Sequence, residues 1–339
     1  MSGNFAKNVP VAVVGATTWG TTLAIKLAAN GTPVSLLTRN EPEAKELESH
    51  RQNRRFLPGV AFPTPLNVAC EIEQIVPAAG LVIIAVPSDR FRENIQRVAG
   101  VISDGATILS VAKGLELPQG KRMSQILREE LPSRLHAGIC ALSGPNLATE
   151  IIQDKPASTV VASNGQEHAE RAQKVLMSNL FRVYTSDDII GVELAGALKN
   201  IIALGAGIAD GLGAGDNGKA AFITRGLAEI TRLGEAAGAK PMTFAGLAGL
   251  GDLVATCASP LSRNHYVGRQ LAQGKTWPEI LQSMDNVAEG VNTTNAALAL
   301  AAELKVEMPI TQTTYRVLFE GLSPQDAVAE LMGRPPRAE

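Results

Sequence analysis

Residues 11–37 constrain the fold of this chain more than any other stretch. Val11–Val14 is a short apolar run that leads into residues 15–20, GATTWG. A helical pattern follows from Thr21 to Asn30, and Pro33–Leu37 has the composition of a second strand. The order strand, tight glycine turn, helix, strand is that of the βαβ unit which opens a dinucleotide-binding domain.

The glycine fingerprint of this unit is incomplete. In the pattern G-x-G-x-x-G, Gly15 and Gly20 fill the first and third positions, and Thr17 stands in the second. The second glycine normally lets the backbone approach a pyrophosphate, so a turn that binds no ligand is an alternative. The start of the helix still favours an anion, and Thr17 and Thr18 add hydroxyl groups.

The residue type after the second strand bears on which dinucleotide would bind. An acidic side chain there would hold the ribose hydroxyl of NAD, but this chain has Thr38-Arg39-Asn40. Arg39 is suited to the additional phosphate of NADP. A solvated loop arginine is the alternative.

Further apolar runs predict a mainly parallel sheet. Leu81–Val86, Thr107–Val111 and Gly138–Leu142 read as strands buried on both faces, and residues 158–162 and 181–184 read as strands that complete the sheet. Ligands bind outside the carboxyl ends of such strands. Lys113, which follows the strand at 107–111, is therefore expected to meet an anionic group, unless it is an ordinary loop lysine.

The pattern changes after residue 185, where only helical periods follow. The sequence therefore predicts an α/β Rossmann-like domain over residues 1–185 and an all-α domain over residues 186–339. The expected helices of the second domain cover residues 185–210, 218–237, 243–247, 263–273, 277–283, 293–304, 309–319 and 323–331.

The helix expected at residues 185–210 carries one lysine in an apolar setting. Thr185 and Asp188 have the spacing of a capping pair at its start. Small residues, among them Ala195 and Gly196, lie one turn from Lys199 and leave room beside its ammonium. A lysine in a buried helix is costly unless it is paired or used, so the alternatives are a reactive cation and a side chain that snorkels to water.

Composition excludes several classes of function. The net charge of −2 and the 4% of aromatic residues give no reason to expect a nucleic acid or an anionic membrane as partner. The three cysteines are far apart, and the histidines lack the H-E-x-x-H spacing, so no metal site is expected. The first ten residues lack the apolar core of a signal peptide, so no signal peptide is expected.

A set of short motifs in fixed order resembles a known family, the NAD(P)-dependent glycerol-3-phosphate dehydrogenases of the bacterial type. The resemblance covers nearly the whole chain. The motifs are Gly15 with Trp19-Gly20-Thr21, Lys113-Gly114, and residues 144–148 (GPNLA), 196–200 (GALKN), 249–253 (GLGDL), 262–264 (SRN) and 289–290 (EG).

The resemblance implies a reaction and a set of roles. Members of the family reduce dihydroxyacetone phosphate to sn-glycerol 3-phosphate with NADPH or NADH in the cytoplasm, and they supply glycerol 3-phosphate for phospholipid synthesis. By analogy with the family, the chain is expected to form a homodimer. Lys199 is implied as the proton donor and acceptor. The implied substrate-binding residues are Lys113, Gly144, Asn146, Lys199, Asp252, Ser262, Arg263 and Asn264. The implied cofactor-binding residues are Thr18, Trp19, Arg39, Lys113, Ala148, Arg263, Val287 and Glu289. The glycine turn adds Gly15, Thr17 and Gly20 to the candidate cofactor site, and Thr17 departs from the family, which usually has glycine there.

Two other functions remain open at this point. A redox-sensing protein could read NADP without turnover, and Thr17 in place of glycine is the feature that favours it. A β-hydroxyacid dehydrogenase of similar build would act on a carboxylate rather than a phosphate. The presence of Lys113, Lys199, Asp252 and Arg263 together favours an enzyme, because a sensor needs no proton donor.

Overall fold

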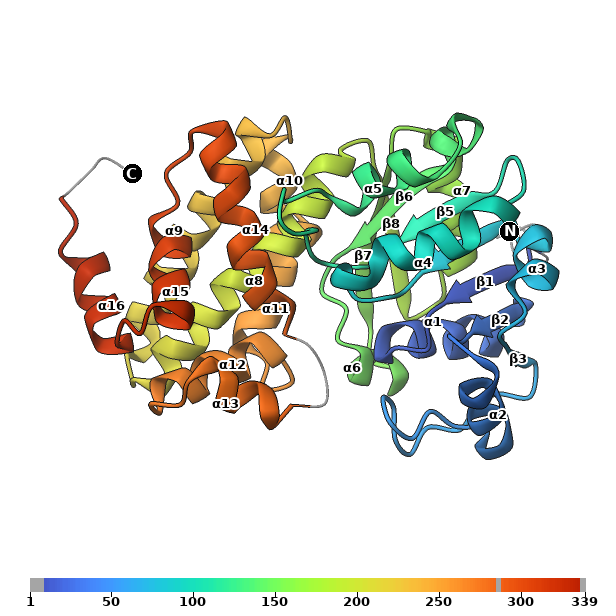
Figure 1. Cartoon of the computed structure of the whole chain (residues 1–339), viewed down its shortest axis with the longest axis horizontal. Coiled ribbons are helices and arrows are strands. Elements are labelled where there is room, and N and C mark those ends of the chain that lie inside the picture. Colours follow the sequence, from blue (N-terminus) through green and yellow to red (C-terminus); the bar gives the residue numbers. More distant parts are fainter. Residues whose placement is uncertain (1–8, 285–287, 336–339) are drawn as a thin grey trace. The chain divides into compact units, whose positions relative to one another are not determined.

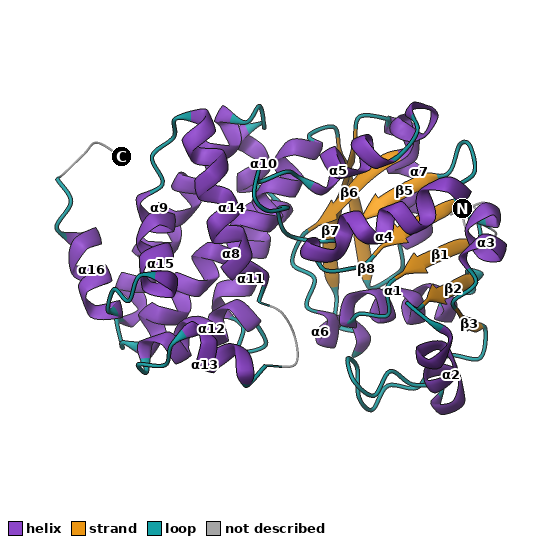
Figure 2. Ribbon diagram, viewed as in Figure 1, coloured by secondary structure: helices purple, strands orange, loops and turns teal. Residues whose placement is uncertain are grey.

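Eight strands form one sheet, in the order β3-β2-β1-β4-β5-β6-β7-β8, in the computed structural model of the chain (Figures 1 and 2). The structure describes residues 9–284 and 288–335. The strands are β1 (Val11–Val14), β2 (Val34–Leu37), β3 (Leu66–Ala69), β4 (Leu81–Ile84), β5 (Thr107–Ser110), β6 (Ile139–Ser143), β7 (Ala157–Ser163) and β8 (Phe181–Ser186). All neighbouring strands are parallel except β6 and β7, which confirms the prediction of a mainly parallel sheet.

Burial explains which strands the sequence reveals. All four residues of β4 and of β5 are buried, and such strands read as continuous apolar runs. The edge strand β3 has the sequence LNVA, and of its residues Leu66 alone is buried. The sequence does not predict β3, because a half-exposed edge strand of four residues carries little apolar signal.

The described chain divides into two compact units. The first comprises the chain up to Ala112 together with Met123–Val192, and the second comprises Lys113–Arg122 together with the chain from Glu193. The sheet lies in the first unit (Figure 2). The α-helices of the first unit are α1 (Thr18–Ala29), α2 (Glu41–His50), α3 (Ile72–Ile75), α4 (Phe91–Val98), α5 (Met123–Glu130), α6 (Ala148–Ile152) and α7 (Gln166–Leu176).

Apart from one bridge between Glu116 and Lys121, the regular secondary structure among the described residues of the second unit is helical, and this confirms the predicted class. Its helices are α8 (Ile189–Gly211, whose first turn belongs to the first unit), α9 (Gly215–Ala236), α10 (Pro241–Ala245), a π-helical turn (Leu247–Gly251), α11 (Asp252–Ala258), α12 (Arg263–Ala272), α13 (Trp277–Gln282), α14 (Glu289–Leu304), α15 (Pro309–Phe319) and α16 (Pro324–Met332).

Helix α8 is a core helix that begins later than the sequence predicts. Thr185 belongs to strand β8, so its predicted role in a capping pair is wrong. Asp188 caps the helix, because its Oδ1 accepts from the Gly191 N–H at 2.9 Å. The length and composition of α8 would suit a membrane span, but 89% of its most apolar window is buried within the protein, as is usual for a core helix.

The segment Lys113–Arg122 belongs to the second unit although its neighbours in sequence belong to the first. Arg122 forms an ion pair with Glu193 at 2.7 Å, and both side chains are largely buried. A Cβ atom at Gly120 would lie 2.7 Å from the Ala296 carbonyl oxygen, so this segment packs closely on α14. These contacts fix the segment that begins with Lys113 against the helices of its own unit.

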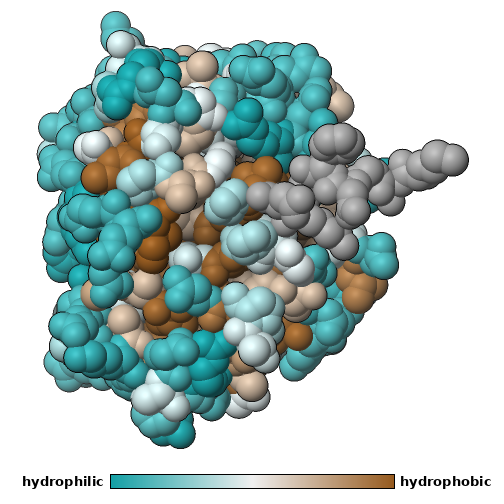
Figure 3. All heavy atoms as spheres, turned by 90° about the vertical axis from the view of Figure 1, so that its right-hand side faces the viewer, coloured by the Kyte–Doolittle hydropathy of each residue, from teal (hydrophilic) through white to brown (hydrophobic). Residues whose placement is uncertain are grey.

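Apolar side chains also occur on the outside of the molecule. On the face in Figure 3, hydrophobic residues are interspersed with hydrophilic ones. Apolar atoms make up much of the surface of most folded proteins, so this face alone does not indicate a binding site.

Candidate active site

The turn between β1 and α1 packs directly on the end of β4. Gly15 has φ +110°, and a Cβ there would lie 2.7 Å from the Ala85 carbonyl oxygen. A Cβ at Gly20 would lie 2.1 Å from the Gly15 carbonyl oxygen. Buried Asn53 donates to the Ala16 carbonyl oxygen at 2.9 Å and holds the turn from the other side. Glycine is therefore required at both motif positions by the close approach of backbone to backbone.

Thr17 has a structural role in this turn that the sequence does not reveal. Its hydroxyl donates to the Ala85 carbonyl oxygen at 2.8 Å and accepts from the Gly20 N–H at 3.1 Å. The hydroxyl therefore caps α1 and ties the turn to β4. The sequence suggested that it is available to an anion, but its proton is already donated within the turn. Thr18 and Trp19 occupy the first two positions of the helix, where N–H groups have no partner within the helix.

Four buried polar atoms without a hydrogen-bond partner among the described residues come from the carboxyl ends of the strands or from the start of α1. They are Trp19 Nε1, Ser110 Oγ, Ser143 Oγ and Asn146 Oδ1. Ser110 and Ser143 are the last residues of β5 and β6, which are neighbours in the sheet. Buried polar atoms are rarely left unpaired, so their gathering at this edge indicates a ligand. Together with the start of α1, these residues fit a dinucleotide.

Two other predicted cofactor residues follow strands of this sheet, one after β2 and one after β6. Arg39 follows β2, and 71% of its side chain is exposed, with Glu43 at 3.8 Å as its ion-pair partner. Ala148 is the first residue of the short helix α6, which follows β6. The structure leaves the Arg39 guanidinium accessible to a phosphate, and its contact with cofactor stays a prediction.

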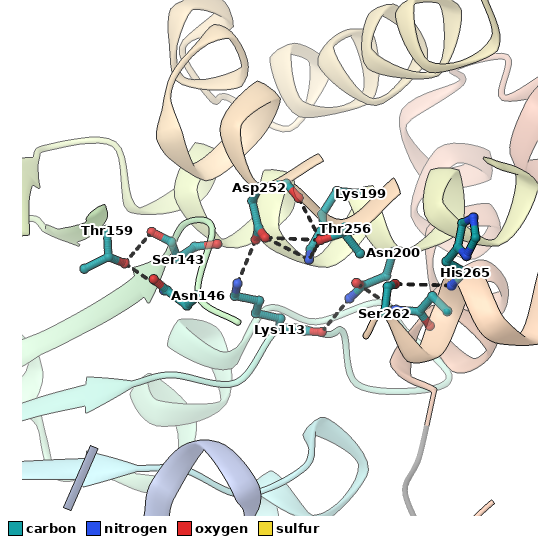
Figure 4. A network of polar contacts seen from close by, with 11 residues as sticks. Lys113, Ser143, Asn146, Thr159, Lys199, Asn200, Asp252, Thr256, Ser262 and His265 are labelled. Carbon is teal, nitrogen blue, oxygen red and sulfur yellow. Dashed lines mark hydrogen bonds and ion pairs between the residues drawn. The ribbon is translucent and has the colours of Figure 1, made fainter. Parts of the chain in front are cut away.

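In the second unit, Asp252 brings the two predicted lysines together. Its Oδ1 accepts from Lys199 Nζ at 2.9 Å, and its Oδ2 accepts from Lys113 Nζ at 2.7 Å (Figure 4). The side chains of Lys199 and Asp252 are 6% and 3% exposed, so this is a buried ion pair and Lys199 does not snorkel to water. Lys113 is 19% exposed and is the member of the cluster nearer to solvent.

Thr256 completes this cluster. Its hydroxyl donates to the Asp252 carbonyl oxygen at 2.7 Å and accepts from Lys199 Nζ (Figure 4). Burial lowers the pKa of Lys113 to about 8, and the nearby Lys199 cation adds to this shift, whereas Asp252 opposes it. The cluster therefore holds two ammonium groups against one carboxylate, with one of them able to lose its proton near neutral pH.

A chain of amides connects the lysine cluster to α12 and α14. Asn200 Nδ2 donates to the Lys113 carbonyl oxygen at 3.3 Å. Asn264 Nδ2 donates to Asn200 Oδ1 at 2.9 Å, and Asn264 Oδ1 accepts from the Gly290 N–H at 3.0 Å. Asn264, predicted to line the substrate, thus also joins three segments of its unit.

The predicted substrate-binding residues 262–264 lie at the start of α12, where the sequence predicts a helix over residues 263–273. Ser262 caps this helix, and its Oγ accepts from the His265 N–H at 3.2 Å (Figure 4). Arg263 is the first residue of α12 and is exposed. Partial loss of solvent lowers the pKa of the Arg263 guanidinium, and the charge of Glu289, which opens α14, opposes this shift. Val287 lies outside the described residues.

Two glycines set the distance between α8 and α12. A Cβ at Gly268 would lie 2.0 Å from the Leu204 carbonyl oxygen, and a Cβ at Gly207 would lie 2.1 Å from the His265 carbonyl oxygen. His265 Nε2 also contacts Asp210 Oδ2 at 2.6 Å. The helix that carries Arg263 is therefore held closely against the helix that carries Lys199.

Several residues of the site are not predicted by sequence reasoning. Thr256 could have been found from its spacing, because it lies four residues after Asp252 on one helix face. Ser110 and Ser143 carry a weaker signal, since each is a polar residue at the end of an apolar strand. Thr17 and Asn53 depend on contacts between distant segments and carry no local signal.

The chemistry of both units defines a class of protein. One unit has a sheet edge suited to a dinucleotide, and the other has an ammonium cluster suited to proton transfer. No group of three or more His, Cys, Asp or Glu side chains among residues 9–284 and 288–335 could hold a metal ion. Fold and site together are typical of a two-domain NAD(P)-dependent oxidoreductase.

Comparison with known proteins identifies the family. Residues 10–169 match the model of the NAD-dependent glycerol-3-phosphate dehydrogenase N-terminus, and residues 188–329 match that of the C-terminus. The chain therefore belongs to the NAD-dependent glycerol-3-phosphate dehydrogenase family, which confirms the resemblance seen in the sequence motifs.

Individual relatives span almost the whole chain. It is 49% identical over 323 residues to a glycerol-3-phosphate dehydrogenase [NAD(P)+] of Dehalococcoides mccartyi, covering 95% of this chain and 90% of the relative. It is 48% identical to that of Chlorobium limicola, covering 97% and 99% of the two chains. The crystal structure of glycerol-3-phosphate dehydrogenase from Coxiella burnetii matches with a TM-score of 0.90 and 38% identity, covering 96% and 99%.

Proposed function

We propose that this chain interconverts dihydroxyacetone phosphate and sn-glycerol 3-phosphate with NADPH or NADH. Family membership supports the reaction, and one structural observation carries the assignment of residues. Lys199 and Lys113 both donate to Asp252, which puts a buried, orientated ammonium pair in the helical unit. That arrangement suits a reaction in which negative charge develops on a ketone oxygen.

Lys199 is the general acid in this proposal. The reduced nicotinamide, when bound, supplies the hydride that the carbonyl carbon accepts. Lys199 Nζ holds the ketone oxygen and transfers a proton to it, so that a hydride and a proton together convert the ketone into an alcohol. Asp252 and Thr256 keep this ammonium in one orientation through their hydrogen bonds. In the reverse reaction, neutral Lys199 takes the hydroxyl proton.

The other substrate-binding residues serve the phosphate and the carbon chain. Arg263 binds the phosphate through a two-point hydrogen bond, and the capped start of α12 adds N–H donors. Lys113 provides a second cation. Gly144, Asn146, Asp252, Ser262 and Asn264 complete the proposed substrate-binding set.

The first unit supplies most of the proposed cofactor-binding residues, from the β1–α1 turn and from the residues that follow β2 and β6: Gly15, Thr17, Thr18, Trp19, Gly20, Arg39 and Ala148. Lys113, Arg263, Val287 and Glu289 of the second unit complete the proposed set. Thr17 acts by shaping the turn. The exposed Arg39 guanidinium favours NADPH over NADH.

The cellular role follows from the reaction. We propose a cytoplasmic enzyme that supplies glycerol 3-phosphate for phospholipid synthesis, acts as a homodimer, and needs no membrane or nucleic acid. The apolar helix α8 is consistent with this, because it is buried in the protein.

A substrate panel tests the reaction. The purified chain is incubated with NADPH or NADH and either dihydroxyacetone phosphate or short 2-keto and 3-keto acids, and the absorbance of the reduced nicotinamide is followed. The reduced nicotinamide should be consumed with dihydroxyacetone phosphate and not with the keto acids. Turnover of a keto acid instead would favour a hydroxyacid dehydrogenase, and NADPH binding without any turnover would favour a sensor.

A further inference from the structure

One hydroxyl group fixes the direction of a buried amide after β6. Thr159 lies on β7 and is fully buried. Its Oγ1 donates to the Ser143 carbonyl oxygen at 2.9 Å and accepts from Asn146 Nδ2 at 2.9 Å (Figure 4). Asn146 Oδ1 is buried and has no partner among the described residues.

The orientation of the Asn146 amide follows from counting protons. A backbone carbonyl can only accept, so the single proton of the Thr159 hydroxyl is committed to Ser143. Thr159 can therefore only accept from Asn146, which must turn its NH₂ group toward Thr159. The Asn146 carbonyl oxygen then points away from Thr159, and it offers a ligand an acceptor rather than a donor.

The backbone around this amide is held by the same residue. Gly144 has φ +149°, and a Cβ there would lie 3.0 Å from Thr159 Cα and 3.1 Å from Thr159 Oγ1. The segment that connects Ser143 to Asn146 therefore packs directly on β7. Thr159 thus fixes both the position of this segment and the rotation of the amide.

The neighbouring unpaired atoms indicate what the ligand group must be. Ser110 Oγ and Ser143 Oγ end two adjacent strands, are each on residues 2% exposed, and have no partner among the described residues. One carbonyl oxygen and two hydroxyls complement a neutral group that both donates and accepts. A phosphate or carboxylate would face the lone pairs of Asn146 Oδ1, which disfavours an anion at this position.

We propose that Thr159 is a positioning residue that directs the Asn146 carbonyl oxygen toward a hydrogen-bond donor of the bound ligand. The inference rests on the proposed function, which supplies two such donors. One is the carboxamide N–H of the nicotinamide, and the other is the free hydroxyl of dihydroxyacetone phosphate. The chemistry is the same for both, and the test separates them.

The test compares Thr159→Val, which removes the hydroxyl with little change in shape, with Thr159→Ser, which keeps it. Dissociation constants are measured by fluorescence for NADPH and for its reduced 3-acetylpyridine analogue, whose acetyl group has no N–H. The KM and kcat for dihydroxyacetone phosphate are measured beside them. Thr159→Ser should match the wild type within about twofold, because it makes the same two hydrogen bonds.

If the donor is the nicotinamide carboxamide, Thr159→Val should bind NADPH about 3- to 10-fold more weakly than the wild type and should bind the analogue equally well. If the donor is the hydroxyl of the substrate, the variant should bind both cofactors as the wild type does. Its KM for dihydroxyacetone phosphate should then rise by about the same factor, with less change in kcat. Unchanged values for all three ligands, or an equal weakening of all three, would overturn the proposal.

A second variant covers the case in which Thr159→Val does not fold. Asn146→Leu removes the acceptor but leaves the bond from Thr159 to Ser143, and it should abolish the preference for NADPH over the analogue or raise the KM. Retention of both wild-type values would sink the idea. The cofactor titrations need no turnover, so a chain that binds NADPH but does not reduce dihydroxyacetone phosphate would overturn the proposed function while leaving this inference testable.

Discussion

Lys113 and Lys199 donate to opposite oxygens of one carboxylate, that of Asp252, at 2.7 and 2.9 Å. Neither lysine has the carboxylate to itself, so the cluster keeps a net positive charge when both are protonated. A developing negative charge on a bound ketone would offset that charge. The cost of holding two buried cations close together is thus recovered when a substrate oxygen becomes negative.

The activity should depend on the protonation of Lys113. Its pKa of about 8 lies below the ordinary 10.5 because of burial and the Lys199 cation. The charged form is therefore lost as pH rises through about 8, and kcat/KM for dihydroxyacetone phosphate should fall on that side. Because kcat/KM reports the free enzyme, its pH profile is the measurement. Lys113→Arg should move this fall to higher pH, and an unchanged profile in that variant would assign the fall to another group.

The same shift predicts how stability varies with pH. The unfolded chain keeps the Lys113 proton up to about 10.5 and the folded chain up to about 8, so the unfolded state binds more protons between these values. The contribution of Lys113 to the free energy of unfolding should therefore rise from pH 8 to 10.5. Denaturant titrations of wild type and Lys113→Met would show this as a smaller pH dependence in the variant.

The close crossing of α8 and α12 should control substrate binding. Gly268→Ala would place a methyl group 2.0 Å from the Leu204 carbonyl oxygen, so the helices must move apart. We expect a loss of roughly 1–3 kcal/mol in stability, as is typical of overpacking, and a raised KM because α12 begins with Arg263. Gly100→Ala is the control, since a Cβ there meets nothing within 4 Å. Equal stability of the two variants would contradict the role of this crossing.

The Arg39 side chain should select between the two cofactors. It is 71% exposed and follows the strand that precedes the expected ribose position. Arg39→Ala should weaken NADPH by about 10- to 150-fold, the worth of a charged hydrogen bond of roughly 1.5–3 kcal/mol, and should leave NADH nearly unchanged. Arg134→Ala is a matched control, because Arg134 is 51% exposed and is also ion-paired. It precedes β6, whereas Arg39 follows β2, so the two arginines belong to opposite ends of their parallel strands. Equal effects on NADH and NADPH would refute the assignment.

The periodic elements could be predicted from sequence, whereas many contacts of the site could not. Strands buried on both faces, such as β4, appear in the sequence as apolar runs, and Ser262 indicates the start of a helix. Lys199 could be identified as unusual because it is charged in an apolar helix. Its pairing with Asp252 joins residues 53 positions apart, and no local pattern encodes such a contact.

The same limit explains what the sequence reading missed in the first unit. In the sequence, Thr17 interrupts a glycine motif. In the structure, its hydroxyl holds the β1–α1 turn through two hydrogen bonds, one of them to Ala85, which is 68 residues away. Thr159 reads as an ordinary β-branched strand residue, and its influence on Asn146 depends on which group its single proton serves. Side chains that act through a distant partner can be recognised when that partner is in place.

The last prediction concerns Lys199. Lys199→Ala should still fold, because Asp252 keeps Lys113 as a cationic partner at 2.7 Å. NADPH binding should change little, since the proposed phosphate contacts of the cofactor lie in the other unit. Turnover should fall by the ~10²–10⁴ typical of a general acid, and further if stabilisation of the oxygen is lost as well.

Lys199→Arg should not restore turnover, because a guanidinium does not release a proton near neutral pH and needs more space. Lys219→Ala is the matched control: this lysine also pairs with an aspartate of the same unit, Asp210 at 2.6 Å, and is not proposed to contact substrate or cofactor. NADPH titrations and circular dichroism separate a chemical defect from a folding defect. Substantial turnover in Lys199→Ala with cofactor binding intact would assign the proton to another group, and Lys113, on the other oxygen of Asp252, would be the next residue to test.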